Sequence, residues 1–292
     1  MIVVKLMGGL GNQMFQYAAG RSLAQRTGSK LFMDLSWFDI AYTTDTIREY
    51  ELDCFGLPNS FKSVNSLTLI EKFEPTLKSR LYKVTKGLRK PYAIHFIEKD
   101  QTYNKAFESL EGNVYLDGWW QSQKYFKDIR SQLLKDFTNK KDPQGQNVDW
   151  LKSIQSSNSI SLHVRRGDYA NNKNTKSYHG LIGLDYYKAA SSKIAKKVKD
   201  PHFFVFSDEP EWCKKNLKLD FPTTYISGNK DGSEDLRLMK NCKHNIIANS
   251  SFSWWGAWLN RHPDKMVIAP KRWFSDPKAN ATDIVPAEWV RL

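Results

Sequence analysis

The feature that most constrains the fold is the alternation of short apolar runs and longer amphipathic runs in the second half of this 292-residue chain. Runs such as SISLHV and HFFVFS have the length and the β-branched or aromatic content of buried strands, whereas SEDLRLMKNC has its apolar residues at helical spacing. Strands that alternate with helices form parallel sheets. The alternation predicts a doubly wound α/β fold, with strands at residues 159–164, 202–207, 223–227 and 244–249 and helices at residues 148–156, 183–198, 209–217, 233–242 and 251–260.

The N-terminal end shows the same order of elements. The strand IVVKLM is followed by the glycine-rich turn GGLGNQ, the helix MFQYAAGRSLAQRTG and the strand KLFMDLS, which together predict a βαβ unit. A polar stretch at residues 138–147 separates the two patterns. We therefore expect two α/β domains, residues 1–145 and residues 146–292, with the last helix able to return to the first domain. Ligands of such sheets bind beyond the carboxyl ends of the strands, and the cleft between the domains is the default site.

Composition narrows the class of protein. No run approaches the roughly 18 to 20 apolar residues of a membrane span, and the N-terminus lacks the basic region and cleavage site of a signal peptide. We therefore expect a cytoplasmic protein. The three cysteines lack C-x-x-C spacing and indicate neither a disulfide framework nor a zinc site. The net charge of +13 suits nucleic acid, an anionic membrane surface or a phosphorylated substrate.

Residues 77–92 carry part of this charge. The segment, LKSRLYKVTKGLRKPY, has six Lys or Arg and no acidic residue, which predicts a basic amphipathic helix. Such a helix either presents a solvated face or contacts an anionic membrane. A peripheral location at the inner face of the cell membrane is therefore the alternative to a purely cytoplasmic one.

The glycine-rich turn GGLGNQM matches neither common phosphate-binding motif. Met14 stands where a dinucleotide fingerprint has its third glycine, and no Lys-Ser/Thr pair follows as in a P-loop. Gly9 and Gly11 still permit a tight turn and the close approach of a ligand, and Asn12 and Gln13 offer amides at a helix N-terminus. The turn is either a ligand-contacting loop or simply a tight connection between strand and helix.

The stretch HVRRGD places charge directly after an apolar strand. The strand delivers Arg165, Arg166 and Asp168 to the carboxyl edge of the sheet, and His163 lies on the same side of the strand as Arg165. A guanidinium can bind a diphosphate through two hydrogen bonds and stays charged at any working pH. Asp168 could orient an arginine, accept a hydrogen bond from a hydroxyl or act as a base. The alternative is an ordinary surface pair of arginine and aspartate.

Two more strand ends place polar groups at this edge. Asp208 follows the strand HFFVFS and could contact a ribose or a base edge, or cap the next helix. Ser250 and Ser251 open a helix whose N-terminus suits a phosphate, and Asp235 opens the helix before it. The tryptophans of SWWGAW are expected in the core rather than against a ligand.

Metal chemistry has little support in the sequence, which contains no D-x-D, no H-E-x-x-H and no His/Cys cluster with ligand spacing. Arginine and helix N-termini would then carry the charge of a leaving group. The pattern favours a transferase with a diphosphate leaving group that needs neither a metal nor another cofactor.

These motifs, in their order and spacing, resemble those of the bacterial α-1,2-fucosyltransferases of glycosyltransferase family 11. The segments GGLGNQMFQYA, HVRRGDY, FSDEPEW and NSSFSWWGAWL carry the resemblance, LDGWWQSQKYF supports it, and it extends over residues 2–273. It implies a GT-B arrangement, in which two Rossmann-like domains face each other across a cleft and bind the acceptor and GDP-fucose respectively. The implied reaction transfers L-fucose from GDP-β-L-fucose, with inversion, to the 2-hydroxyl of a terminal β-galactose in lactose, N-acetyllactosamine or an O-antigen unit.

The resemblance also implies roles for single residues. Arg165 would bind the β-phosphate of the donor and act in catalysis, and His163 would lie by the guanosine. Asp208 would contact the guanine or the ribose. The other residues implied at the donor site are Arg166, Asp235, Ser250 and Ser251.

The catalytic base is less defined. Some relatives place a glutamate a few residues beyond the arginine motif, but residues 169–184 contain no carboxylate here. The candidates are Asp168, Asp34 or Asp39 of the first domain, or no discrete base. Trp37 is a further candidate on the acceptor side.

Three alternatives stay open from the sequence alone. The chain could use another GDP-sugar on the same scaffold, or it could be a sugar-binding module without catalysis. Its charge and aromatic content also suit a nucleic-acid-binding protein, but no recognised module of that class appears, so we expect no nucleic-acid partner. The oligomeric state is not indicated.

Overall fold

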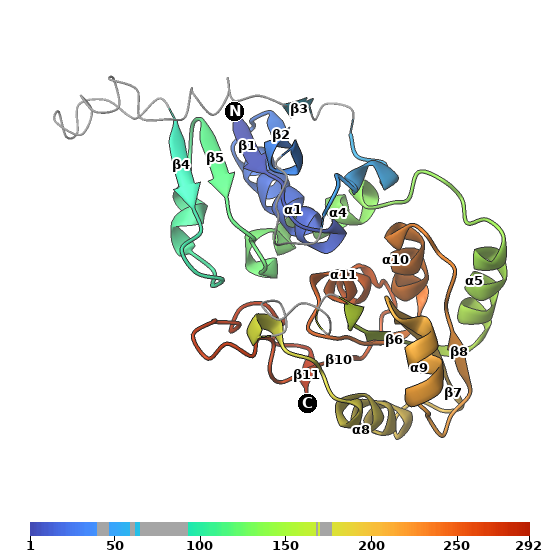
Figure 1. The fold of residues 1–292 in the computed structure, drawn as a ribbon. Helices are drawn as coiled ribbons and strands as arrows, with labels where there is room; N and C mark the ends of the chain where they lie inside the picture. The colour runs from blue at the N-terminus through green and yellow to red at the C-terminus, as the bar shows by residue number, and fades with distance from the viewer. Residues whose placement is uncertain (40–46, 59–61, 65–92, 168, 170–176) are drawn as a thin grey trace. The chain divides into compact units, whose positions relative to one another are not determined.

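The computed structural model describes residues 1–39, 47–58, 62–64, 93–167, 169 and 177–292 (Figure 1). The chain divides into two compact units, Met1–Thr138 with Thr282–Ile284 and Asn139–Ala281 with Val285–Leu292. The division falls after Thr138, where the sequence places it after residue 145. The basic helix expected at residues 77–92 lies outside the described residues. None of the described helices is both long and apolar enough to cross a membrane.

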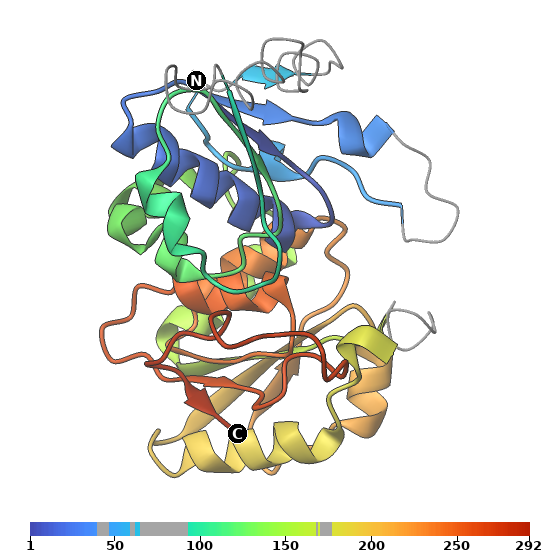
Figure 2. The same cartoon turned by 90° about the vertical axis from the view of Figure 1, so that its left-hand side faces the viewer.

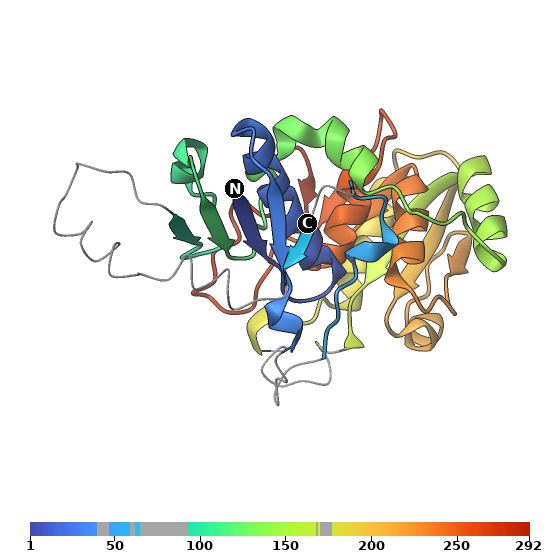
Figure 3. The same cartoon turned by 90° about the horizontal axis from the view of Figure 1, so that it is seen from above.

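The first unit is built on a parallel sheet with the strand order β3-β2-β1-β5-β4. Figures 1 and 3 show β4, β5, β1 and β2 side by side. The βαβ unit expected at the N-terminus is confirmed. The elements of the unit are β1 (Ile2–Lys5), α1 (Leu10–Arg26), β2 (Leu31–Asp34), β3 (Lys62–Val64), β4 (Ile94–Ile97), β5 (Val114–Asp117), α4 (Arg130–Asp136) and the short 3-10 helices Ser36–Asp39, Leu52–Cys54, Lys105–Ser109, Gln123–Tyr125 and Lys127–Ile129.

A buried carboxylate joins α4 to α1. Asp136 is 2% exposed and accepts hydrogen bonds from the hydroxyl of Tyr17 at 2.9 Å, from Nε of Arg21 at 3.2 Å and from Nε2 of Gln132 at 2.7 Å. A buried charge is costly unless it is paired and hydrogen-bonded, and these three donors meet that requirement. The network fixes α1, whose N-terminus carries the glycine-rich turn.

The segment that returns to the first unit is not the expected C-terminal helix but the turn Thr282–Ile284. Asp283 is its anchor. Its carboxylate forms an ion pair with Nζ of Lys124 at 2.5 Å and accepts a hydrogen bond from the backbone N–H of Tyr103 at 2.8 Å.

The second unit is a doubly wound sheet, as the alternation of elements predicts. All neighbouring strands are parallel, in the order β11-β10-β9-β6-β7-β8. Its elements are α5 (Gln146–Ser156), β6 (Asn158–Val164), α8 (Leu184–Ala195), β7 (Pro201–Ser207), α9 (Pro210–Asn216), β8 (Thr223–Tyr225), α10 (Gly232–Asn241), β9 (His244–Ile246), α11 (Ser251–Leu259), β10 (Val267–Ala269) and β11 (Val290–Arg291).

Helices cover both faces of this sheet because its strands are apolar on both sides. Along β7, Phe203 and Val205 belong to an apolar cluster with side chains of α8 and α9, whereas Phe204 and Phe206 belong to a second cluster with side chains of α5 and α10. Figure 2 shows the sheet between α8 on one side and α10 on the other. The α/β class is thus confirmed, and the polar residues that follow each strand lie at one edge.

Candidate functional site

The strand order of the second unit singles out one place on the sheet. From β6 the chain builds outward through β7 to β8, and from the neighbouring β9 it builds outward through β10 to β11. Ligands of open α/β sheets bind beyond the carboxyl ends of the strands at such a reversal of order. The segments at this point are residues 165–167 after β6 and residues 249–251 after β9. They are connected by Tyr169, whose hydroxyl donates to the carbonyl oxygen of Asn249 at 3.3 Å.

Asp208 holds Arg165 at the end of β6. Its Oδ2 lies 2.9 Å from Nη1 of Arg165, and its Oδ1 accepts a hydrogen bond from the backbone N–H of Arg166 at 3.0 Å. A Cβ at Gly167 would lie only 2.5 Å from Oδ2, so the carboxylate occupies the space that this glycine leaves open. The guanidinium of Arg165 also lies over the ring of Tyr169, with Cζ 5.4 Å from the ring centroid. Asp208 therefore does not cap α9 but sets the direction of Arg165.

Arg166 is directed to different partners. Its Nε donates to Oε2 of Glu209 at 2.9 Å, and its Cζ lies 3.6 Å from the centroid of the Trp212 ring. These contacts tie the end of β6 to the first turn of α9. The structure thus gives the two neighbouring arginines different partners, and it leaves Arg165 as the stronger candidate for a bound diphosphate. Glu209 and Trp212 were not among the predicted site residues, although both stand in the segment FSDEPEW.

His163 is a buried, neutral side chain beneath this edge. It is 4% exposed, and its ring centroid lies 5.7 Å from that of Phe252 in α11. Burial lowers the pKa of His163 to about 4; the charge of Arg165 acts in the same direction, and the charge of Asp208 opposes it. Its Nδ1 is buried and has no hydrogen-bond partner among the described residues. A buried nitrogen of this kind calls for a partner, which agrees with the predicted contact to a ligand.

The pKa of His163 predicts a loss of stability in mild acid. The imidazole takes up a proton near pH 6.5 in the unfolded chain but only near pH 4 in the folded chain, so the unfolded state binds more protons between these values. The free energy of unfolding should therefore fall by about 2 kcal/mol between pH 7 and pH 5 through this residue. Denaturant unfolding of the wild type and of His163→Phe at both pH values measures the difference. If the free energy of unfolding falls by the same amount between pH 7 and pH 5 in both proteins, the prediction is wrong.

The other predicted donor residues open helices. Ser250 is the N-cap of α11 and is 6% exposed, and Ser251 is the first residue of that helix. The tryptophans of α11 pack in the core, as expected, since Trp254 and Trp255 are fully buried.

Asp235 lies in the first turn of α10 with a different set of partners. It accepts a hydrogen bond from Nδ2 of Asn229 at 2.8 Å, and Asn229 is in turn held by Asn147 at 2.8 Å. Burial raises the pKa of Asp235 to about 6, the bond from Asn229 acts against that rise, and the carboxylates of Glu234 and Asp231 add to it. None of these partners belongs to the group around Arg165.

Asn249 is a structural residue of the site that the sequence does not identify as such. It is 1% exposed, and its Nδ2 donates to the carbonyl oxygens of His179 at 2.9 Å and of Trp273 at 3.1 Å. One side chain thus joins the end of β9 to two loops distant in sequence. The only local signal is a polar residue at the end of an apolar strand.

Asn249→Ala should destabilise the second unit. The substitution removes the donor from two carbonyl oxygens in a buried place, and an unsatisfied buried polar group costs about 1 to 3 kcal/mol. We expect a loss of about 2 kcal/mol in the free energy of unfolding, measured by urea denaturation. Ser156→Ala, a change at an exposed residue of α5, is the control and should leave stability within about 0.5 kcal/mol. Wild-type stability in Asn249→Ala would rule out this role.

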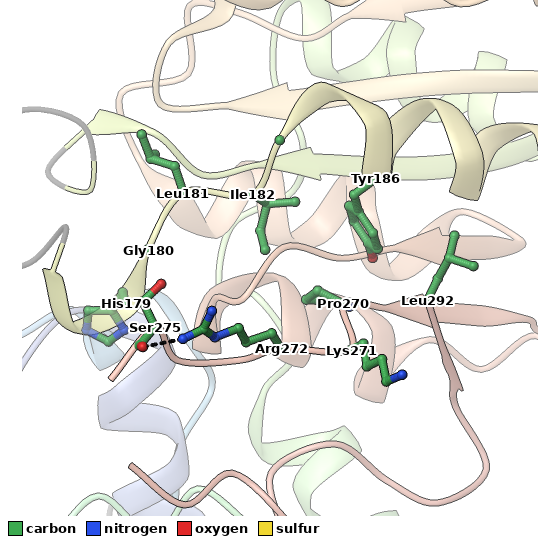
Figure 4. Close-up of a pocket in the computed structure, with 11 residues that line it drawn as sticks. His179, Gly180, Leu181, Ile182, Tyr186, Pro270, Lys271, Arg272, Ser275 and Leu292 are labelled. Carbon is green, nitrogen blue, oxygen red and sulfur yellow. Dashed lines mark hydrogen bonds between the residues drawn. The ribbon is translucent and has the colours of Figure 1, made fainter. Parts of the chain in front are cut away.

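A cavity of about 310 Å³ lies beside the loop that Asn249 holds. Its walls are residues 179–183 and 270–272 together with Tyr186, Ser275 and Leu292. Figure 4 shows Arg272 reaching Ser275, whose carbonyl oxygen accepts a hydrogen bond from Nη2 of the guanidinium at 2.5 Å. The cavity combines apolar walls with the cationic side chains of Lys271 and Arg272.

In the first unit the predicted glycine-rich turn is held by its own chain. Gln13 is fully buried, and its Nε2 donates to the carbonyl oxygens of Gly8 at 2.9 Å and of Glu49 at 2.8 Å. Oε1 of Glu51 accepts a hydrogen bond from the backbone N–H of Leu10 at 3.1 Å. A carboxylate of the protein thus already stands at the N-terminus of α1, the place where the glycine-rich sequence suggests a ligand.

The remaining members of the turn have separate roles. Gly9 is the N-cap of α1 with an extended backbone, and Gly11 is buried within the helix. Oδ1 of Asn12 accepts a hydrogen bond from Nε2 of Gln121 at 2.8 Å. Asn12 therefore joins the turn after β1 to the segment that follows β5.

The acceptor-side candidates differ in their environment. Asp34 is 3% exposed, and its two oxygens accept hydrogen bonds from the hydroxyl of Tyr115 at 2.6 Å and from the backbone N–H of Ser36 at 2.9 Å. It holds the turn after β2. Asp39 is exposed at the end of a 3-10 helix, and Trp37 packs edge-on against Phe38 with ring centroids 5.2 Å apart. Asp168 lies outside the described residues.

Comparisons with known proteins extend over the whole chain. The family model described as "Glycosyl transferase family 11" matches residues 1–292. An alpha-1,2-colitosyltransferase of Escherichia coli is 35% identical over 300 residues, covering 100% of this chain and 98% of the relative. The O-antigen biosynthesis glycosyltransferase WbnK of the same organism is 31% identical over 305 residues, covering 98% and 99%.

More distant matches include animal and plant proteins. The galactoside 2-alpha-L-fucosyltransferase Sec1 of Mus musculus is 24% identical over 269 residues, covering 89% of this chain and 64% of the relative. Among solved structures, a mutant of Arabidopsis thaliana FUT1 in complex with GDP matches with a TM-score of 0.52 and 11% identity, covering 99% of this chain and 75% of that one. This structural likeness supports the α/β fold.

Proposed function

Because the chain belongs to glycosyltransferase family 11, we propose that it is an inverting α-1,2-fucosyltransferase. It would move L-fucose from GDP-β-L-fucose to the 2-hydroxyl of a terminal β-galactose. The observation that carries the proposal is the guanidinium of Arg165, which Asp208 holds at the strand-order reversal of the second sheet. The names of relatives that act on galactosides and in O-antigen biosynthesis support the acceptor class.

In this reaction Arg165 binds the β-phosphate of the donor. The bond between C1 of fucose and the phosphate oxygen breaks, GDP leaves with the electron pair, and O2 of galactose forms the new bond on the opposite face. Negative charge grows on the β-phosphate as the bond breaks, so a fixed guanidinium stabilises the transition state more than the ground state. The N-terminus of α11, with Ser250 and Ser251, adds N–H groups and hydroxyls of the right polarity. As the new bond forms, the proton of the acceptor hydroxyl passes to a base such as Asp168 or, where no discrete base acts, to water.

We propose further that the reaction requires no divalent metal, since Arg165 and the N-terminus of α11 supply the positive charge that a metal supplies elsewhere. Mass spectrometry of lactose incubated with the protein, GDP-fucose and EDTA tests both the transfer of fucose and its independence of a metal. The expected product is lactose with one added deoxyhexose, formed at the same rate with and without EDTA, and linkage analysis assigns it to position 2. Loss of product with EDTA and its return with Mg²⁺ or Mn²⁺ would reject metal independence alone.

A second candidate donor is GDP-colitose, because the relative that is 35% identical is a colitosyltransferase. Colitose is fucose without the 3-hydroxyl, so the two donors present the same diphosphate to Arg165. Competition between equal concentrations of the two GDP-sugars gives the ratio of their kcat/KM values directly. We expect fucose to be preferred, and a preference of tenfold or more for colitose would change the donor while leaving the α-1,2 linkage in place.

The place of action is also a proposal. We expect the protein to work on the cytoplasmic side of the membrane, with residues 77–92 in contact with anionic lipid. Flotation with anionic vesicles tests this, and the contact is rejected if replacement of Lys78, Arg80, Lys83 and Lys86 by glutamine leaves flotation unchanged.

A further inference from the structure

Strands β1 and β5 are parallel neighbours in the sheet of the first unit, with β2 and β3 beyond β1 and with β4 beyond β5. The turn after β1 and the segment after β5 therefore meet at the carboxyl edge of this sheet. A Cβ at Gly8 would lie 3.2 Å from Cζ3 of Trp119, and the side chain of Gln121 is hydrogen-bonded to that of Asn12 at 2.8 Å. Ligands of open parallel sheets bind beyond the carboxyl edge, and at this place the edge is framed by an indole ring and two carboxamides.

We propose that this place is the acceptor-sugar subsite, with the indole of Trp119 as the platform for one face of a hexopyranose and the amides of Asn12 and Gln121 as partners for its hydroxyls. The inference rests on the proposed function and names the residues that would hold its second substrate. It also assigns a positioning role to Glu98, which acts through the backbone of Trp119.

The backbone conformation at the subsite supports a specialised role. Trp120 has a φ of 56°, a left-handed conformation that is strained for a bulky residue. Such strain persists where the surrounding structure enforces it, and it is concentrated at functional sites. Here Oε2 of Glu98 enforces it, because it accepts hydrogen bonds from the backbone N–H groups of Trp119 at 2.6 Å and of Trp120 at 3.1 Å.

The strained turn sends two neighbouring tryptophans to different environments. Trp120 is fully buried, and its ring packs with those of Phe96, Phe107 and Tyr125. Trp119 is half-buried, and its ring takes no part in that aromatic cluster of the described residues. The packing of the Trp120 ring and the hydrogen bonds to Glu98 thus offset the strain of the turn. The turn in return holds the indole of Trp119 at the edge of the sheet.

The chemistry of the place favours a neutral sugar over a phosphate. Helix N-termini attract anions, but the backbone N–H of Leu10 already donates to the carboxylate of Glu51. An indole offers a broad apolar surface that matches the C–H face of a pyranose, and carboxamides both donate and accept hydrogen bonds, as hydroxyls do. A β-galactoside, with one apolar face and several hydroxyls, has the matching pattern.

Steady-state kinetics with GDP-fucose and lactose test the platform. Trp119→Ala should raise the KM for lactose at least about tenfold, since it removes the stacking surface, and should leave the KM for GDP-fucose within twofold. Trp119→Phe, which keeps a smaller ring, should fall between. Trp150→Ala is the matched control, because Trp150 is also half-buried but lies in α5 of the second unit, against the apolar cluster of Phe204 and Phe206. An unchanged lactose KM in Trp119→Ala, or an equal rise in Trp150→Ala, overturns the proposal.

Glu98 is tested by a pair of variants. Glu98→Ala removes the acceptor of both N–H groups and should raise the lactose KM about as much as Trp119→Ala. Glu98→Gln keeps an oxygen that can accept from the same groups, so it should restore most of the wild-type KM. If Glu98→Gln instead abolishes kcat and keeps the lactose KM, Glu98 is a base and its positioning role is rejected.

Binding without the donor separates this inference from the proposed function. Saturation-transfer NMR should detect contact of methyl β-galactoside with the wild type and a loss of that contact in Trp119→Ala. Binding that depends on Trp119, in a protein that transfers no fucose, would reject the proposed function and retain the subsite. Fucose transfer that is unchanged in Trp119→Ala would retain the proposed function and reject the subsite.

Discussion

Arg165→Ala is expected to lower turnover at least about 100-fold at saturating GDP-fucose, because the loss of one fixed hydrogen-bond donor that stabilises developing charge typically costs a factor of about 10² to 10³ in rate. Nη1 of Arg165 is held by Asp208 at 2.9 Å and its Cζ lies over the Tyr169 ring, so the group is in place before the donor binds. A guanidinium that is already in place does not have to reorganise when negative charge develops on the leaving GDP, so it stabilises the transition state more than a mobile side chain would. The measurement is kcat for transfer to lactose, together with the affinity for GDP by calorimetry.

Arg166→Ala is the matched control. It removes the same side chain at the next position, but Arg166 pairs with Glu209 at 2.9 Å and stacks on Trp212. We expect it to lower stability while reducing kcat less than about tenfold. A folded Arg165→Ala protein with near-normal turnover, or a larger loss of turnover in Arg166→Ala than in Arg165→Ala, would contradict the division of labour between the two arginines.

The positions of most site residues follow from the sequence because of a simple geometric rule. In a parallel sheet the carboxyl ends of all strands lie at one edge, so a polar residue directly after an apolar run is placed there by the strand itself. Arg165 after β6, Asp208 after β7 and Ser250 after β9 are located this way. The rule needs only the ends of the strands, which the alternation of apolar and amphipathic runs indicates.

The partners of these residues could not be predicted in the same way. Asp208 meets Arg166 across 42 positions of sequence, and Tyr115 meets Asp34 across 81. Which carboxylate faces which donor depends on strand order and on register, and the strand order is not written in any local pattern. Asp34 therefore looks like a free carboxylate in the sequence, while in the fold both its oxygens hold a turn.

The segment after β5 shows a different limit. A left-handed residue is usually expected at glycine, and Gly118 stands two positions before the residue that adopts this conformation, Trp120. The strain is imposed by Glu98 from the neighbouring strand end, so it arises only after β4 and β5 have paired. The segment LDGWWQSQKYF supports the family resemblance, but both of its tryptophans follow the same strand, so which of them is buried depends on the fold around Glu98.

Loss of the Asp208 contact should reduce turnover nearly as much as loss of Arg165 itself. Asp208→Ala leaves the charge of Arg165 in place but removes the group that directs it, and a misplacement of about 1 Å can cost about 100-fold in rate. We therefore expect kcat to fall about 30- to 100-fold with GDP affinity reduced less. If Asp208 instead contacted the guanine or the ribose, as the resemblance implies, the affinity for GDP would fall most, and kcat at saturating GDP-fucose would be nearly normal.

Gly167→Ala tests the same contact without removing either charged group. The added Cβ would lie 2.5 Å from Oδ2 of Asp208, so the carboxylate has to move away from Nη1 of Arg165. The kcat of Gly167→Ala should fall toward that of Asp208→Ala. The double variant Gly167→Ala/Asp208→Ala should have a kcat only slightly below that of either single variant, since all three variants disturb one interaction. Gly183→Ala is the control, because a Cβ there meets nothing within 4 Å. Additive losses in the double variant would mean that Gly167→Ala acts by a route other than its contact with Asp208.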